Sequence, residues 1–125
     1  MAERQVIRTD DAPTPTGPFN QAIRHGNLVF TAGQAGRNRE TGEMGDAAEQ
    51  TTWALRNIGA ILDAAGASLS DVVKVTLYVK EGTDTKPINE AYETFFEVLP
   101  ARSMLFVSRL KGPEMLVEIE AVAIV

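Results

Sequence analysis

Arg102 is the residue of this sequence best suited to binding an anionic ligand. It follows the proline break at Pro100 and comes just before the apolar run 104–107. An arginine among apolar residues is costly to desolvate unless an anion meets it. Its planar guanidinium can offer a carboxylate two parallel N–H donors. Arg102 is therefore a candidate for holding the carboxylate of a small ligand.

Glu118 and Glu120 form a second candidate group. They are two residues apart in the β-branched run 117–121, so a strand would place both carboxylates on one face. A glutamate in such a site could position water or move a proton. The spacing also allows a purely structural alternative, in which Arg102 pairs with either glutamate across a hairpin and both glutamates line a solvated face.

The sequence does not indicate several other kinds of functional site. The chain has no cysteine, which excludes disulfides, thiolate metal sites and a cysteine nucleophile. His25 is the only histidine and stands beside Gly26, a turn residue, so no Ser–His or histidine-metal arrangement is indicated. The segment from Gly33 to Gly36 lacks the Gly-Lys-Ser/Thr ending of a phosphate-binding loop.

Length and charge narrow the class of protein. The 125 residues, 44% of them hydrophobic, predict one domain over 1–125 with a single core. A net charge of −5 argues against a nucleic-acid partner. No apolar run approaches the roughly 20 residues of a membrane span, and no signal peptide is recognisable. We expect a cytoplasmic protein with no membrane partner.

Two helices must help to position the candidate residues. Asp46 and Glu49 form a capping box, and apolar residues then repeat at helical spacing as far as Gly66, which ends the helix. The predicted core stripe of this helix is Thr51, Ala54, Leu55, Ile58, Ile61, Leu62 and Ala65. A second helix is predicted around Pro87, with Ile88, Ala91, Tyr92 and Phe95 facing inward.

The strands are predicted from alternation. One covers 5–8, two lie within 20–33 around the turn at Gly26, and one follows Asp71. In that last strand the inward residues are Val73, Val75, Leu77 and Val79. The final two, 104–110 and 115–124, are expected to pair as a hairpin that brings Arg102 and Glu118 towards one end of the sheet. The proline-rich stretch 9–18 and the polar stretch 37–45 are expected to be loops.

The predicted order is β-ββ-α-β-α-ββ, an α+β domain with a single sheet and two helices packed on one face. Two helices cover only one face of the sheet. The other face carries mixed apolar and polar residues, so self-association around a shared centre would be favourable.

Several segments of the chain resemble the RidA/YjgF family of reactive-intermediate deaminases. They occur in the family's order and spacing and cover nearly the whole chain. The matching segments are 17–22, 26–34, 64–75, 89–96, 100–103 and 117–121, which include Gly17-Pro18-Phe19, Pro100-Ala101-Arg102-Ser103 and Val117-Glu118-Ile119-Glu120-Ala121.

This resemblance implies a chorismate-mutase-like fold in a barrel-like homotrimer with sites at the subunit interfaces. It implies hydrolysis of enamines and imines, such as 2-aminoacrylate and 2-iminopropanoate, to a 2-keto acid and ammonia without metal or cofactor. Arg102 would anchor the substrate carboxylate and Glu118 would hold or deprotonate water. Gly33 and the backbone around Ser103 would complete the cradle, with Phe19 and Glu120 as further substrate-binding residues.

Two departures from the family's usual residues bear on substrate specificity. The family's usual tyrosine after Gly-Pro is Phe19 here, and its frequent cysteine two residues after the arginine is Met104. Both changes remove a polar group, which predicts a drier pocket suited to imines of larger apolar amino acids. Two other functions compete with the deaminase: a non-catalytic trimeric binder of small carboxylates, acting as a regulator or holdase, and a ribonuclease or translation inhibitor.

Overall fold

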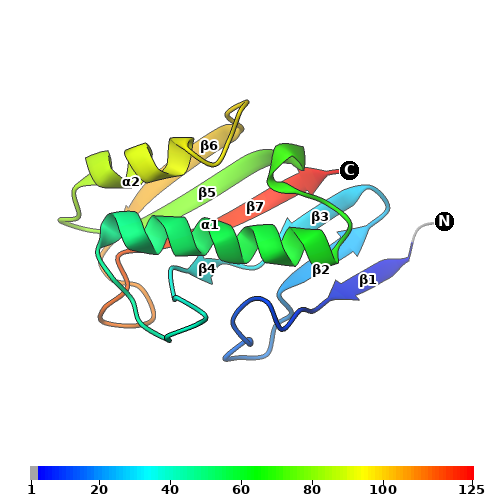
Figure 1. Ribbon diagram of the computed structural model, residues 1–125, viewed down its shortest axis with the longest axis horizontal. Coiled ribbons are helices and arrows are strands. Elements are labelled where there is room, and N and C mark those ends of the chain that lie inside the picture. Colours follow the sequence, from blue (N-terminus) through cyan, green and yellow to red (C-terminus); the bar gives the residue numbers. More distant parts are fainter. Residues whose placement is uncertain (1–2) are drawn as a thin grey trace.

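The computed structural model describes residues 3–125 and contains one mixed, seven-stranded sheet with two helices on one face (Figure 1). The α+β class predicted from the sequence is confirmed. The strands are β1 (Arg4–Ile7), β2 (Ala22–His25), β3 (Leu28–Thr31), β4 (Gln34–Ala35), β5 (Val72–Lys80), β6 (Ala101–Val107) and β7 (Val117–Ile124). They lie in the order β1-β2-β3-β7-β5-β6, and β4 pairs with β7 beyond the end of β3.

The helix α1 (Ala47–Ala64) begins and ends where the sequence predicts. Asp46 and Glu49 form the capping box, and the positive φ of 78° at Gly66 lets the chain turn away after the helix. Every residue of the predicted core stripe is buried. The shorter α2 (Thr85–Glu93) is capped by Asp84 and buries Ile88 and Tyr92. A 3₁₀ turn, η1 (Leu69–Asp71), leads into β5.

The expected hairpin of the last two strands is wrong. β5 lies between β6 and β7, antiparallel to β7 and parallel to β6. The β5-α2-β6 segment is a crossover connection of the kind that joins parallel strands. Turn residues at 111–114 mark a reversal of the chain, but they do not specify which strand the chain joins next.

Two local predictions also need correction. Residues 34–35, just beyond the two strands predicted within 20–33, form the separate strand β4. In β5 a bulge between Val72 and Lys74 shifts the alternation, so Val72 is 7% exposed whereas Val73 is 43% exposed. The bulge does not alter the periodicity that follows it, since Val75, Leu77 and Val79 are buried as predicted.

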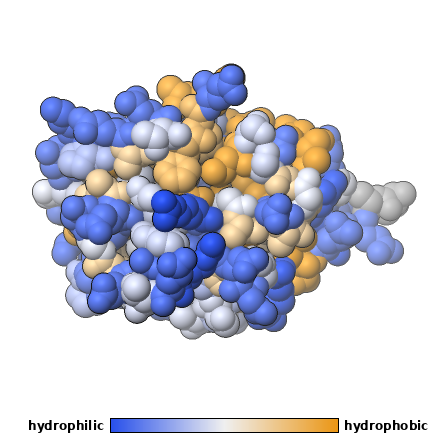
Figure 2. All heavy atoms as spheres, in the orientation of Figure 1, coloured by the Kyte–Doolittle hydropathy of each residue, from blue (hydrophilic) through white to orange (hydrophobic). Residues whose placement is uncertain are grey.

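The two faces of the sheet differ in character. The inner residues of β5 and β7 pack against the helices, whereas Phe30, Leu105 and Ile124 remain exposed on the open face. Figure 2, which views the helix side, shows hydrophobic residues gathered towards the upper right, over the end of the sheet where β7 terminates. Exposed apolar residues of this kind favour self-association. Within residues 3–125, neither helix combines the length and apolar character needed to cross a membrane.

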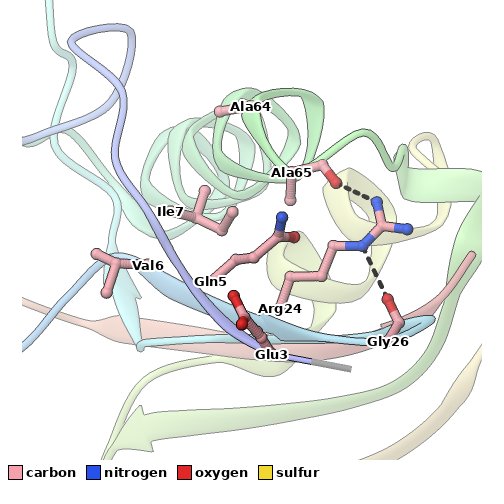
Figure 3. Close-up of a pocket in the computed structure, with 8 residues that line it drawn as sticks. All are labelled: Glu3, Gln5, Val6, Ile7, Arg24, Gly26, Ala64 and Ala65. Atoms are coloured by element: carbon pink, nitrogen blue, oxygen red, sulfur yellow. Dashed lines mark hydrogen bonds between the residues drawn. The ribbon is translucent and has the colours of Figure 1, made fainter. Parts of the chain in front are cut away.

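Arg24 ties the β2–β3 hairpin to the end of α1 (Figure 3). Its Nη1 donates to the backbone oxygen of Ala65 at 2.6 Å, and its Nε donates to that of Gly26 at 2.9 Å. The last carbonyl groups of a helix have no hydrogen-bond partner within the helix, and Arg24 supplies a donor to one of them at the end of α1. Arg24 therefore holds the helix at a fixed place over the sheet.

Candidate active site

The main cavity has a volume of about 780 Å³ and lies where three loops meet. It is lined by the proline-rich segment 13–19, by the segment around β4, and by the loop before β7. In Figure 1 these loops gather along the lower side of the sheet, away from α2 and the start of β6. The cavity thus joins parts of the chain that are distant in sequence.

Glu118 and Gly33 form the floor of this cavity. Glu118 pairs with Ala35 across β4 and β7, and a Cβ atom at Gly33 would lie 2.9 Å from the Cδ atom of Glu118. Such a contact is too short for real atoms, so only glycine leaves the Glu118 carboxylate in its place. Burial and, to a lesser degree, the charge of Glu120 raise the pKa of Glu118, whereas Lys111 acts to lower it. The result is a partly buried carboxylate that holds a proton more tightly than an ordinary glutamate.

Phe19 brings an aromatic ring to the same cavity. The residue is 46% exposed and stands at the end of the proline-rich segment. Phe19, which the resemblance implies as a substrate-binding residue, thus lines the main cavity. The ring supplies apolar surface to that wall and no hydrogen-bonding group.

Glu120 lies next to the cavity on the same face of β7. Its Oε1 accepts a hydrogen bond of 2.8 Å from the hydroxyl of Tyr78. This bond, followed by desolvation and the negative charges of Glu120 and Glu118, raises the pKa of Tyr78, so the phenol stays protonated and continues to donate. Glu120 is therefore held at a fixed position beside Glu118 without lining the described cavity.

Arg102 lies apart from both glutamates within one chain. It pairs with Val75, a buried residue, so its side chain is on the helix side of the sheet, whereas Glu118 and Glu120 alternate onto the open side. The guanidinium lies over the ring of Tyr92, 4.8 Å from its centroid, and Arg102 is exposed. The alternative that Arg102 pairs with Glu118 or Glu120 is therefore wrong, and so is the expectation that β6 and β7 bring Arg102 beside Glu118.

Ser103 lies on the open face, opposite to Arg102. Its Oγ accepts a hydrogen bond of 2.8 Å from the Nζ of Lys74. Of the residues predicted from the sequence, the structure brings Phe19, Gly33 and Glu118 into one cavity, with Glu120 adjacent. Arg102 and Ser103 are on the edge strand β6 and do not reach that cavity in the same chain.

Two buried glutamines that sequence reasoning missed hold the loops of the cavity. Gln21 exchanges hydrogen bonds with Thr9 and donates to the backbone oxygen of Pro13 at 3.0 Å. Gln50 donates to the backbone oxygen of Glu114 at 3.0 Å and accepts from the amide of Leu116 at 2.8 Å. Their signal in the sequence is weak, because a long-range contact from an amide side chain to a loop backbone leaves no local pattern.

A second cavity, of about 600 Å³, lies between the N-terminal strand and the end of α1 (Figure 3). The guanidinium of Arg24 in its wall already donates to two backbone carbonyls. His25 is exposed in the β2–β3 hairpin and lies outside the lining of both cavities. Over residues 3–125, no three acidic or histidine side chains are grouped as metal ligands. Among the described residues that line the main cavity, Glu118 is the one that carries a carboxylate.

Comparison with known proteins gives consistent matches. A family model described as Endoribonuclease L-PSP matches residues 9–125. A RutC family protein of Pyrococcus abyssi is 50% identical over 123 residues, which are 96% of each chain. A protein of Escherichia coli named 2-iminobutanoate/2-iminopropanoate deaminase is 40% identical over 125 residues, 96% of this chain and 97% of the relative. The crystal structure of the E. coli YjgF gene product, 40% identical, superposes with a TM-score of 0.90 over 96% of this chain and 98% of that one.

Proposed function

We propose that this chain, which belongs to the Endoribonuclease L-PSP family that includes the YjgF/RidA proteins, hydrolyses reactive 2-imino acids to 2-keto acids and ammonia. One observation carries the proposal: the carboxylate of Glu118 is partly buried in the main cavity, and the pKa of this carboxyl group is raised. A base whose pKa lies nearer the working pH exchanges protons more effectively in both directions. The deaminase name of a relative 40% identical supports the choice of reaction.

The proposed reaction requires little of the protein, since the imine carbon is already electrophilic. Water adds to C2 of the substrate as Glu118 accepts one of its protons, forming the new C–O bond. The proton then passes from Glu118 to the amine nitrogen. As the C–N bond breaks, the hydroxyl on C2 gives its proton to Glu118 and becomes the carbonyl of the 2-keto acid, and ammonia leaves. Glu118 positions the water and transfers the proton. The reaction is faster because the reactants are held at a fixed distance.

Arg102 completes this site from a neighbouring subunit. Within one chain the guanidinium is on the other side of the sheet from Glu118. The loops that line the cavity also lie away from the start of β6, where Arg102 is located. A homotrimer with sites at its interfaces reconciles this separation with the role expected of Arg102 as the carboxylate anchor. Exposure of Arg102 on the edge strand is what such a role needs, because the guanidinium must reach another chain.

The backbone near Gly33 and the residues Ser103 and Phe19 frame the substrate in this proposal. Glu120, held by Tyr78, adds negative charge that favours the protonated form of Glu118 and of the iminium nitrogen. These residues frame a substrate that has its imine at C2 and a carboxylate at C1.

The test is turnover of an imine generated in solution. A dehydratase acting on serine or threonine releases the three- or four-carbon imine, and semicarbazide traps what has not yet been hydrolysed. We expect the native protein to lower the yield of trapped imine in proportion to its concentration and Glu118→Gln to lose this effect. Binding of a 2-keto acid without any acceleration would contradict the proposal and favour a non-catalytic carboxylate binder.

A further inference from the structure

The main cavity collects positive charge in an acidic protein. The chain has a net charge of −5, yet the cavity is lined by Arg37, Arg109 and Lys111 and by one carboxylate, that of Glu118. Arg109 and Lys111 lie in the loop between β6 and β7, whereas Arg37 follows β4, so the fold is what brings Arg37 to the same cavity.

These cations differ in how far the protein already neutralises them. Arg37 contacts a carboxylate oxygen of Glu114 at 3.5 Å and donates to the backbone oxygen of Gly42 at 2.7 Å. Arg109 donates through its Nε, in a bond of 3.3 Å to the neighbouring Leu110 oxygen. Within residues 3–125, the guanidinium end of Arg109 forms no ion pair. Arg37 is thus committed to its loop, whereas Arg109 keeps its charge available to a ligand.

Lys111 joins the two loops that face each other across the cavity. Its Nζ donates to the Oγ1 of Thr16 at 2.8 Å. An ammonium group has three donors, so two N–H groups remain for other partners. The charge of Lys111 is also close enough to Glu118 to lower the pKa of that carboxyl. Lys111 therefore lies between the proline-rich segment and the carboxylate on the cavity floor.

Under the proposed function, Arg102 of a neighbouring subunit already accounts for the carboxylate at C1 of the substrate. Arg109 and Lys111 are then in excess of what a simple 2-imino acid can neutralise. Both side chains are exposed, so their charged ends are open to a ligand and can form charge-assisted hydrogen bonds with an anion that enters the cavity. A cavity of about 780 Å³ also has room for a longer substrate.

We propose that the preferred substrate carries a second carboxylate at the end distant from the imine, so that it is a 2-imino dicarboxylic acid, with Arg109 and Lys111 binding the distal carboxylate. This inference rests on the proposed function. It revises the expectation of an apolar substrate drawn from Phe19: the aromatic ring contacts the carbon chain, and the cations on the other wall bind its end. The enzyme that supplies such a substrate is one that oxidises an acidic amino acid at its α-carbon.

Matched pairs of imines test this inference. The imines of aspartate and of asparagine differ only by a distal carboxylate or amide, and each can be generated by an amino-acid oxidase of suitable specificity. We expect the native protein to have a kcat/KM about tenfold to a hundredfold higher for the diacid, the range of one charge-assisted contact. The ratio of the two constants should fall about tenfold in Lys111→Met, and Arg109→Gln serves as a second variant should the first not fold.

Lys86→Met is the matched control, because it removes the same charge from an exposed position on α2 outside the cavity. It should leave the ratio of the two constants unchanged. Equal constants for the two imines in the native protein, or an equal fall of the ratio in Lys111→Met and Lys86→Met, would overturn the inference.

A binding measurement separates failure of this inference from failure of the proposed function. Calorimetry with 2-oxoglutarate and with 2-oxopentanoate, which has the same carbon chain without the distal carboxylate, requires no turnover. We expect tighter binding of the diacid by about tenfold or more, weakened by added salt and lost in Lys111→Met. Hydrolysis of neither imine with a retained preference for 2-oxoglutarate would contradict only the deaminase function. Hydrolysis of both imines with no preference in either assay would contradict only the dicarboxylate inference.

Discussion

Tyr78 lies directly opposite Glu118 in the register of β5 and β7, yet it donates its hydroxyl to Glu120 over 2.8 Å. The tyrosine therefore fixes the charge of Glu120 next to Glu118. Because two carboxylates on one strand face repel each other, this arrangement favours the protonated form of Glu118. The proton affinity of the proposed catalytic base thus depends on a pair of residues that need not touch the substrate.

Glu120→Gln is expected to move the acidic limb of the pH profile to lower pH. Burial is the larger cause of the raised pKa of Glu118, and the charge of Glu120 is the second, so removing that charge lowers this pKa but does not return it to its ordinary value. A base with a lower pKa is ionised, and hence active, at lower pH. The measurement is kcat/KM for imine hydrolysis against pH, corrected for uncatalysed hydrolysis. A limb that stays in place or moves to higher pH would show that Glu120 does not act through Glu118.

Glu118→Gln is expected to stabilise the folded protein at alkaline pH. A raised pKa means that the folded state binds this proton more tightly than the unfolded state, so the native protein loses stability as pH rises from the unfolded pKa through the folded one. Glutamine does not ionise and avoids this loss. The variant should therefore unfold at a higher Tm than the native protein at pH 8, with the difference vanishing at a pH below the ordinary glutamate range. A lower Tm at pH 8 would contradict the assigned burial of the charge.

Gly33→Ala is expected to reduce imine hydrolysis by about tenfold to a hundredfold, because the new Cβ displaces the Glu118 carboxylate. Gly59→Ala is the matched control. Its Cβ would meet the Cδ1 of Leu69 at an ordinary 3.6 Å, and alanine within α1 should add about 0.5–1 kcal/mol of stability. Steady-state kinetics and thermal unfolding of both variants provide the comparison. Equal activity in the two variants would mean that Gly33 does not govern the position of Glu118.

Arg102→Ala is expected to slow imine hydrolysis by about 30-fold to 1,000-fold, since it removes a charge-assisted pair worth roughly 2–4 kcal/mol. Its effect on folding should be small, about 1 kcal/mol or less, because the contact that the Arg102 side chain makes among the described residues is an exposed cation–π contact with Tyr92. Arg102→Lys should keep the stability and still be slow, since an ammonium cannot reproduce the bidentate fork. Near-native rates in either variant would remove Arg102 from the mechanism.

The sequence was sufficient for those parts of the fold that depend on local signals. The capping box at Asp46, the helical stripe of α1 and the alternation at Val75, Leu77 and Val79 all depend on neighbours in the chain, and all are confirmed. The pairing of β6 with β5 depends on a crossover through α2, which local patterns do not determine. The bulge at Val72 was missed for a related reason, since one extra residue looks like unbroken alternation until the partner strand is known.

The candidate site was accessible from the sequence only in part. Phe19, Gly33 and Glu118 meet in one cavity, as the resemblance implied that they would lie near the substrate. The cations Arg109 and Lys111 and the supporting residues Gln21 and Gln50 were missed, because their contacts join segments distant in sequence. The face on which Arg102 lies follows from the parallel pairing of β6 with β5. The expected hairpin of the last two strands did not include this pairing.

Complementation between subunits tests the central claim most directly, namely that Glu118 of one chain and Arg102 of another form a single hydrolytic site. Arg102→Ala and Glu118→Gln are each expected to be nearly inactive alone. When the two are unfolded, mixed in equal amounts and refolded together, random assembly gives about a quarter of the sites one intact Glu118 and one intact Arg102. The account predicts that imine hydrolysis recovers to about a quarter of the native rate per site. Mixed oligomers, verified by mass spectrometry, that remain as inactive as either variant alone would contradict it.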